Sequence, residues 1–242
     1  MNQPTLHQLA DHYGTDKGFN TLNAHGYTRI YESLLRNVRE QPLRILEIGL
    51  LHPALHQSTK SQHGSFSVAP SLQMWAHYLP RALIAGFDIE DFSSLQHDRI
   101  QTWRADQSDR ASLNLAAEQA CQRFGGAFDL IIDDGSHSSA HQQITLVTLL
   151  PYLHPTGAYV IEDLHYQPSD IELPGISKTR QLLKGLAHES TAQAIQTVLK
   201  NEELAWLQTN IASIHFFDSL DRDRPNPVDS MDALAVIKRA II

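Results

Sequence analysis

The chain contains little cysteine, has no long apolar run and carries fewer basic than acidic residues. Cys121 is the only cysteine among 242 residues, which excludes an intrachain disulfide and a cysteine-based zinc site. No segment reaches the roughly 18 consecutive apolar residues of a membrane-spanning helix. The first residues lack the basic and apolar regions of a signal peptide, so we expect a cytoplasmic protein without a membrane partner.

The charge balance limits the classes of partner. Lysine and arginine number 19 against 27 aspartates and glutamates, which gives a formal net charge of −8 when the histidines are neutral. Because binding to nucleic-acid phosphates needs a basic surface, this balance argues against nucleic acid as the main partner.

Strand-like apolar runs alternate with helical patterns along the chain, which predicts an α/β fold with a parallel sheet. The last two apolar runs have no helix between them, which predicts an antiparallel hairpin at one edge. The long connections at residues 51–70 and 218–232 are typical of functional or disordered loops. The predicted strands are 43–48, 82–88, 100–104, 128–132, 158–161, 211–217 and 233–240, and the predicted helices are 3–13, 26–38, 71–78, 110–123, 139–153 and 176–208, the last as one helix or two.

Two of the buried strands end abruptly in acid. Asp134 follows one of them, and Glu162 and Asp163 follow the other. Because ligands of open α/β sheets bind outside the carboxyl ends of the strands, we expect these carboxylates at one rim. Carboxylates this close together are costly unless a proton or a cation lies between them. His137, three residues after Asp134, adds a group that exchanges protons near neutral pH, so we predict a metal site with an adjacent base.

An alternative for these acids is that they are solvated residues that cap helices, as acids in strand-to-helix loops often are. Asp133 is a separate case, because strand alternation sends its side chain to the opposite face from that of Asp134. We therefore interpret Asp133 as structural.

Several short blocks follow one another along the chain. They are Gly14-Thr15-Asp16-Lys17, His25-Gly26-Tyr27, Tyr31-Glu32, Ile45-Leu46-Glu47-Ile48-Gly49, Ser71-Leu72-Gln73-Met74-Trp75, Gly86-Phe87-Asp88-Ile89, Asp106-Gln107-Ser108-Asp109, Ile132-Asp133-Asp134-Gly135-Ser136-His137, Val160-Ile161-Glu162-Asp163 and Ile214-His215-Phe216-Phe217-Asp218-Ser219. The order of these blocks resembles that of class I S-adenosylmethionine-dependent O-methyltransferases of the macrocin and mycinamicin sugar O-methyltransferase type, with the cephalosporin hydroxylase-like proteins as a neighbouring group. The resemblance runs from about residue 8 to the C-terminus.

The resemblance implies a Rossmann-like seven-stranded methyltransferase sheet with helices on both faces and a C-terminal antiparallel hairpin. It divides the chain into an N-terminal helical cap region, residues 1–40, and a methyltransferase domain, residues 41–242. It also implies S-adenosylmethionine and Mg²⁺ as cofactors, a small hydroxylated molecule as substrate and, as in many members of the family, a homo-oligomer.

Residue roles follow from the same resemblance. Its metal ligands correspond to Asp134, Glu162 and Asp163, and its general base to His137. The residues implied at the cofactor are Glu47 and Gly49 at the methionine part, Asp88 at the ribose, Asp106 and Gln107 at the adenine, and in addition Ser71 and Tyr27.

The predicted activity is Mg²⁺-dependent methyl transfer to a hydroxyl of a small molecule, with a sugar of a glycosylated natural product as the expected acceptor. Two alternatives remain. The acceptor is a carboxylate or phenol instead, or the protein is a non-catalytic, cofactor-binding partner of the hydroxylase-like kind. The segment after Gly49 keeps the second one open, because Leu50, Leu51, His52 and Pro53 stand where a cofactor loop usually carries further glycines.

Overall fold

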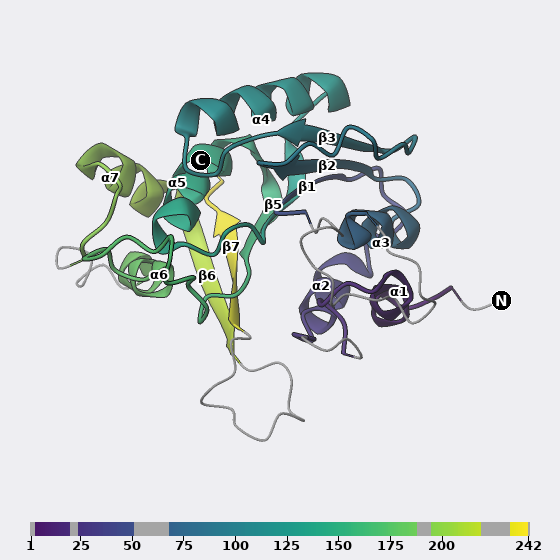
Figure 1. Cartoon of the computed structure of the whole chain (residues 1–242), viewed down its shortest axis with the longest axis horizontal. Helices are drawn as coiled ribbons and strands as arrows, with labels where there is room; N and C mark the ends of the chain where they lie inside the picture. Colours follow the sequence, from purple (N-terminus) through teal and green to yellow (C-terminus); the bar gives the residue numbers. More distant parts are fainter. Residues whose placement is uncertain (1–2, 20–23, 51–67, 188–194, 219–232, 242) are drawn as a thin grey trace.

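The computed structural model describes residues 3–19, 24–50, 68–187, 195–218 and 233–241, and these form a seven-stranded sheet between two groups of helices (Figure 1). The strand order is β3-β2-β1-β4-β5-β7-β6. Strands β1 to β5 pair in parallel, whereas β7 pairs antiparallel with both β5 and β6. The predicted Rossmann-like sheet with a C-terminal antiparallel hairpin is confirmed.

Most boundaries lie within four residues of those predicted from the sequence, but residues 195–200, inside the helical stretch predicted at 176–208, are not helical. The strands are β1 (Arg44–Ile48), β2 (Leu83–Asp88), β3 (Ile100–Arg104), β4 (Phe128–Asp133), β5 (Leu153–Ile161), β6 (Ile211–Asp218) and β7 (Ala233–Arg239). The helices are α1 (Leu6–Tyr13), α2 (Thr28–Leu35), α3 (Pro70–Tyr78), α4 (Arg110–Phe124), α5 (Ser139–Leu149), α6 (Thr179–Ala187) and α7 (Asn201–Asn210), and a 3₁₀ turn, Leu150–Tyr152, follows α5.

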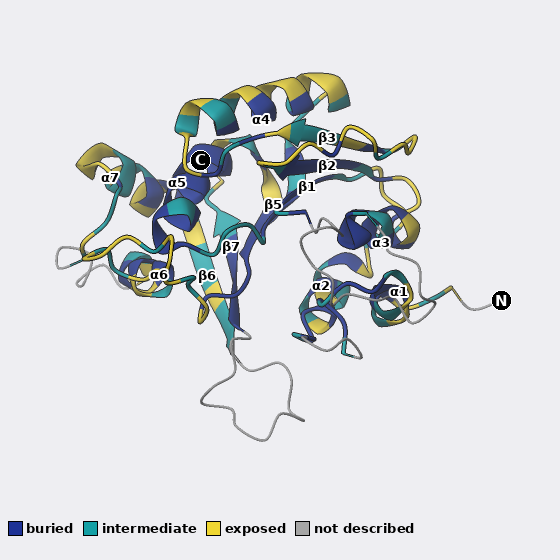
Figure 2. Ribbon diagram, viewed as in Figure 1, coloured by how far each residue is buried: buried dark blue, intermediate teal, exposed yellow. Residues whose placement is uncertain are grey.

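Alternation along the strands divides the buried apolar residues into two clusters, one on each face of the sheet (Figure 2). In β1, Leu46 and Ile48 pack with residues of α4 and α5, while Ile45 packs with residues of α1, α2 and α3. Whether a residue occupies an odd or an even position along its strand therefore decides which helices its side chain contacts. We call this the strand parity, and it applies to the acids that follow the strands as well.

The N-terminal helices share the second of these clusters with the sheet. Leu6 of α1 and Tyr31 of α2 are fully buried in the same cluster as Trp75 of α3 and Ile84 of β2. The division of the chain at residue 40 stays a prediction.

Strand β5 begins five residues earlier than predicted. Leu153 pairs with Phe128, and the register then shifts before Leu130 pairs with Ala158. The sequence did not indicate this start, because Pro155 and Gly157 interrupt the apolar run and residues 154–156 are exposed.

Two other predictions lie mainly outside the described residues. The long loops predicted at 51–70 and 218–232 fall almost entirely on segments 51–67 and 219–232.

Among the helices that the structure describes, none is long and apolar enough to cross a membrane.

Candidate active site

The carboxyl ends of β1, β4 and β5 bring Glu47, Asp134, Glu162 and Asp163 to one rim, where the sequence predicted the last three. Strand parity places Glu47 and Glu162 on the face of α1, α2 and α3, and it sends Asp133 to the face of α4 and α5. Glu47 and Glu162 are almost completely buried, whereas the Asp134 side chain is 19% exposed.

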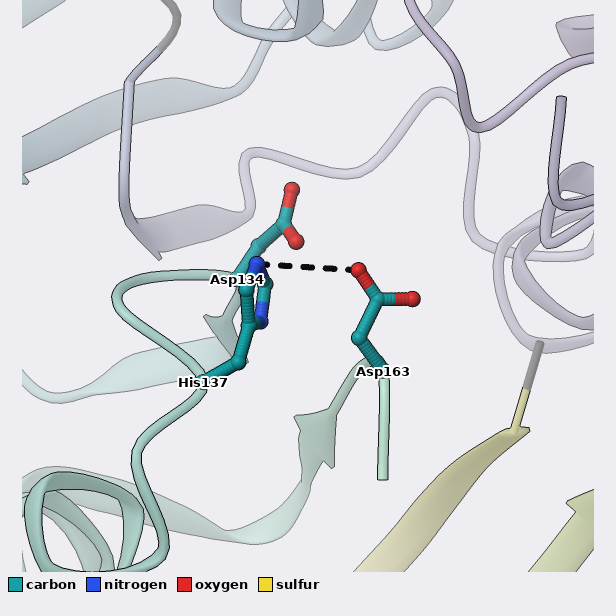
Figure 3. A group of neighbouring side chains, drawn as sticks. All are labelled: Asp134, His137 and Asp163. Carbon is teal, nitrogen blue, oxygen red and sulfur yellow. Dashed lines mark ion pairs between the residues drawn. The ribbon is translucent and has the colours of Figure 1, made fainter. Parts of the chain in front are cut away.

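Asp134, His137 and Asp163 form the group that could hold a metal ion (Figure 3). One ligand atom from each lies within 4.8 Å of the others, and His137 Nε2 lies 3.6 Å from Asp163 Oδ2. His137 and Asp163 both have a positive φ, of 60° and 53°. Such a backbone is unfavourable for residues with a side chain, so the surrounding structure must hold these two in place.

The donor set of this group fits Mg²⁺. Mg²⁺ prefers oxygen ligands and is usually bound through one or two carboxylates, with water and substrate oxygens completing its coordination. Asp134 and Asp163 supply two carboxylates beside a cavity, so the geometry leaves room for such oxygens.

Glu162, the third predicted ligand, is placed differently. Its Oε2 accepts a hydrogen bond from Lys17 Nζ at 2.8 Å, and its Oε1 accepts one from the Tyr31 hydroxyl. Both oxygens are therefore engaged within the protein, and Glu162 lies outside the three-residue group above. Burial and the neighbouring Asp134 carboxylate raise the pKa of Glu162, although Lys17 acts in the opposite direction.

Lys17 is a residue of this site whose role the sequence did not indicate. Its side chain is completely buried, and its ammonium lies 2.6 Å from Asp134 Oδ2 and 3.4 Å from Glu47 Oε1, in addition to its contact with Glu162. Burial alone would lower the pKa of Lys17, but Asp134, Glu162 and Glu47 raise it well above its usual value. Lys17 is therefore a fixed positive charge. The only sign of it in the sequence was its place in the Gly14–Lys17 block.

Tyr27 lies beside the metal-binding group rather than on the wall of the cavity. Its hydroxyl donates to Asp163 Oδ1 at 2.6 Å, and His25 stacks on its ring. Burial and the Asp163 carboxylate raise the pKa of Tyr27 well above its usual value, so the phenol remains a donor. This contact indicates that Tyr27 orients Asp163.

A cavity of about 490 Å³ opens at the same rim. Its wall contains eight of the predicted site residues, and residues that were not predicted, such as Thr15 and Ile171, lie there as well. The predicted residues on the wall are Gly49, Ser71, Asp88, Asp106, Gln107, Asp134, His137 and Asp163. Glu47, Tyr27 and Glu162 lie behind this wall.

Asp88 and Asp106 both order the backbone around the cavity. Asp88 Oδ2 accepts from Leu50 N at 2.7 Å, which ties the start of the loop after β1 to the end of β2. Asp106 Oδ1 accepts from both the backbone nitrogen and the hydroxyl of Ser108, and these bonds lower the pKa of Asp106. A carboxylate has further lone pairs, so both acids can still accept bonds from a ligand.

Gln107 connects the end of β3 to the loop after β4. Its Nε2 donates to Asp133 Oδ1 at 2.6 Å, and its Oε1 accepts from Ser136 N at 2.9 Å. A Cβ at Gly135 would lie 2.4 Å from Gln107 Oε1, so only glycine permits this approach. Gln107 therefore supports the loop that carries Asp134 and His137.

One carboxylate oxygen of Glu47 accepts a hydrogen bond, and the other lies near Lys17 without one. Its Oε2 accepts from Trp75 Nε1 at 2.6 Å. Its Oε1 is buried and accepts no hydrogen bond from the described residues, with Lys17 Nζ 3.4 Å away. A buried acceptor without a hydrogen bond is costly, and the Lys17 ammonium beside it offsets this cost.

The sequence of the chain is similar to those of sugar O-methyltransferases. The chain is 34% identical to the demethylmacrocin O-methyltransferase of Streptomyces fradiae over 197 residues. This alignment covers 77% of this chain and 46% of that protein. It is 30% identical over 232 residues to the mycinamicin VI 2''-O-methyltransferase of Micromonospora griseorubida, covering 90% and 52% of the two chains. The resemblance to sugar O-methyltransferases is confirmed.

A solved methyltransferase supports the same relationship. The MycE methyltransferase from the mycinamycin biosynthetic pathway, in complex with Mg and SAH, superimposes with a TM-score of 0.71 at 29% identity, over 99% of this chain and 55% of that one. The chain thus spans about half the length of the sugar O-methyltransferases that it matches. No protein-family model matches the chain.

Proposed function

We propose that the protein is a Mg²⁺-dependent O-methyltransferase that moves a methyl group from S-adenosylmethionine to a hydroxyl of a small molecule. We further propose that the hydroxyl belongs to a sugar of a glycosylated natural product. The observation that carries the proposal is the group of Asp134, His137 and Asp163 on the wall of a cavity that also contains Asp88 and Asp106.

Each part of S-adenosylmethionine would have a suitable group at the cavity. Glu47 would face the methionine part of the cofactor from behind the wall, where it pairs with Lys17, and Gly49 would allow close approach. Asp88 would accept from the ribose hydroxyls, and Asp106 would contact the adenine edge. Ser71 lines the same wall, while Gln107 and Tyr27 would act through Ser136 and Asp163, respectively.

Asp134 and Asp163 would hold Mg²⁺, and Glu162 would support or complete this site. When bound, Mg²⁺ supplies a positive charge that makes the acceptor hydroxyl more acidic and orients it. His137 Nε2, on the side of Asp163, would take the hydroxyl proton as the oxygen forms its bond to the methyl carbon and the bond from that carbon to the sulfonium sulfur of S-adenosylmethionine breaks. Asp163 would stabilise the imidazolium that results, since its carboxylate lies 3.6 Å away.

Support for the acceptor class comes from the relatives. They are O-methyltransferases that act on demethylmacrocin and on mycinamicin VI, and the MycE methyltransferase has been solved in complex with Mg, SAH and mycinamycin VI. Small-molecule acceptors also fit a cavity of about 490 Å³.

The test is calorimetry with S-adenosylmethionine and MgCl₂, followed by a screen of glycosylated metabolites for a mass gain of about 14 Da. Binding of both ligands and methylation of a sugar hydroxyl are expected. Methylation of a carboxylate or phenol alone would overturn the acceptor class, and binding of the cofactor without any methylated product would favour a non-catalytic partner protein. Absence of cofactor binding would overturn the whole proposal.

A further inference from the structure

The acids at the rim have two environments, one open to the cavity and one closed. Asp134, His137 and Asp163 line the cavity, with side chains 12–19% exposed. Behind them, Glu47 and Glu162 meet the Lys17 ammonium, and all three of these side chains are no more than 1% exposed. Asp134 belongs to both environments, because its Oδ2 contacts Lys17.

Lys17 therefore lies where three carboxylates converge from three adjacent strands. Glu47 belongs to β1, Asp134 follows β4 and Glu162 follows β5, and β1, β4 and β5 are neighbours in the sheet. Three carboxylates around one point at 2.6–3.4 Å resemble the oxygen cage that holds a divalent cation in proteins. Here the cage holds an ammonium that is part of the chain.

The segment that carries Lys17 is fixed by its own backbone. Helix α1 ends at Gly14 in the left-handed region, with φ of 76°. Residues 16–18 then pair with residues 25–28 through three hydrogen bonds, including one of 3.0 Å from Thr28 N to Lys17 O. The ammonium thus has a defined position rather than the freedom of a surface lysine.

No other lysine or arginine of the described part of the chain makes an ion pair with Glu47, Asp134, Glu162 or Asp163. Burying several carboxylates without a cation is very costly, so this cluster requires a positive charge in its closed half. The chain supplies that charge whether or not a metal ion is bound.

We propose that Lys17 is a positioning residue whose ammonium fills a cation site among Glu47, Asp134 and Glu162, and so confines exchangeable metal binding to the side of the rim that faces the cavity. This proposal rests on the proposed function for its consequence in catalysis. Lys17 keeps Glu47 and Glu162 aligned while leaving Asp134 and Asp163 to the metal ion.

The first measurement is the number of Mn²⁺ ions bound per chain. It is obtained from the electron paramagnetic resonance signal of the Mn²⁺ that stays free. Lys17→Ala removes the charge and opens the space, so it is expected to bind one Mn²⁺ more than the wild-type protein. Lys17→Arg keeps a cation and is expected to bind the wild-type number. Lys17→Ala with Glu162→Gln lacks one acid of the cage and is expected to lose the additional ion.

The second measurement is the melting temperature with and without Mn²⁺. Mn²⁺ is expected to raise the melting temperature of Lys17→Ala by more than that of the wild-type protein, because it restores the missing positive charge. If Lys17→Ala does not fold without metal, refolding in Mn²⁺ is expected to recover it. A lysine that only fills space would give none of these metal effects.

The proposal is overturned if Lys17→Ala binds the same number of ions as the wild-type protein, or if Mn²⁺ neither stabilises nor refolds it. Its failure is distinguishable from failure of the proposed function. A wild-type protein that binds no Mn²⁺ would contradict the metal site of Asp134 and Asp163, yet a gain of one ion in Lys17→Ala would still support the role of Lys17.

Discussion

Asp133 gives the sharpest prediction about stability, because it is a completely buried acid with an incomplete set of partners. Gln107 Nε2 donates to its Oδ1, while its Oδ2 accepts no hydrogen bond from the residues that the structure describes. Burial raises the pKa of Asp133 from its usual 3.8 to about 7, although the bonds from Gly135 and Gln107 oppose this rise. The native protein therefore keeps a proton on Asp133 at pH values where the unfolded chain has lost it.

The sign and size of the effect follow from this difference. The stabilisation that the protonated Asp133 provides is complete below about pH 4 and is lost as the pH rises through about 7. Over the whole range the shift corresponds to about 4 kcal/mol, at about 1.4 kcal/mol for each unit of pKa. Between about pH 5.5 and pH 8, where the protein is easily handled, about 2 kcal/mol of this amount is expected to disappear.

The test is Asp133→Asn, which keeps the carbonyl oxygen that Gln107 contacts and cannot ionise. Urea unfolding at several pH values in EDTA, which keeps metal ions from Asp134, gives the free energy of unfolding of both proteins. The wild-type protein is expected to lose about 2 kcal/mol relative to Asp133→Asn between about pH 5.5 and pH 8. The exposed Asp98→Asn serves as the matched control and is expected to follow the wild-type protein. Parallel curves for the wild-type protein and Asp133→Asn would refute the reasoning.

Three further predictions concern the chemistry and the packing of the rim. His137→Ala is expected to lower kcat by about 10²- to 10⁴-fold while leaving S-adenosylmethionine affinity unchanged in calorimetry, with the exposed His154→Ala as control; unaltered turnover would exclude His137 as the base. Gly49→Ala is expected to destabilise the protein by about 3 kcal/mol in urea unfolding, because its Cβ would lie 2.0 Å from Asp134 O. Gly125→Ala shares a positive φ but meets no neighbouring atom, so about 1 kcal/mol is expected there, and equal losses would contradict the steric argument. EDTA is expected to abolish methyl transfer and MgCl₂ to restore it, whereas full activity in EDTA would contradict a role for the metal.

Much of the fold could be predicted because the strands of a buried parallel sheet are short continuous apolar runs. Residues 128–132 and 82–88 show this pattern, and the observed strands differ by at most one residue. The start of β5 could not be predicted in this way, because Leu153 joins the sheet through pairing with Phe128 across a register shift. Such pairing depends on the neighbouring strand rather than on local composition.

Some residues of the candidate site could likewise be predicted from local sequence, and others could not. Asp134 and Asp163 could be found because their place at strand ends follows from local sequence, and strand alternation correctly separated Asp133 from them. Lys17 could not be assigned in this way, since two of its three partners, Asp134 and Glu162, lie more than 100 residues away along the chain. The sequence predicted a proton or a cation among the acids, and the structure places the Lys17 ammonium there, whereas the metal ion stays a prediction.

The left-handed backbone at His137 and Asp163 has a consequence for protein engineering. Glycine at either position would relax a conformation that costs a residue with a side chain about 1–2 kcal/mol, and would remove the imidazole or carboxylate at the same time. A selection for thermal resistance alone would therefore favour losing the His137 side chain, whereas loss of the Asp163 side chain would also remove the acceptor of the buried Tyr27 hydroxyl. Attempts to harden this scaffold for use as a biocatalyst should hold both positions constant and seek their improvements elsewhere.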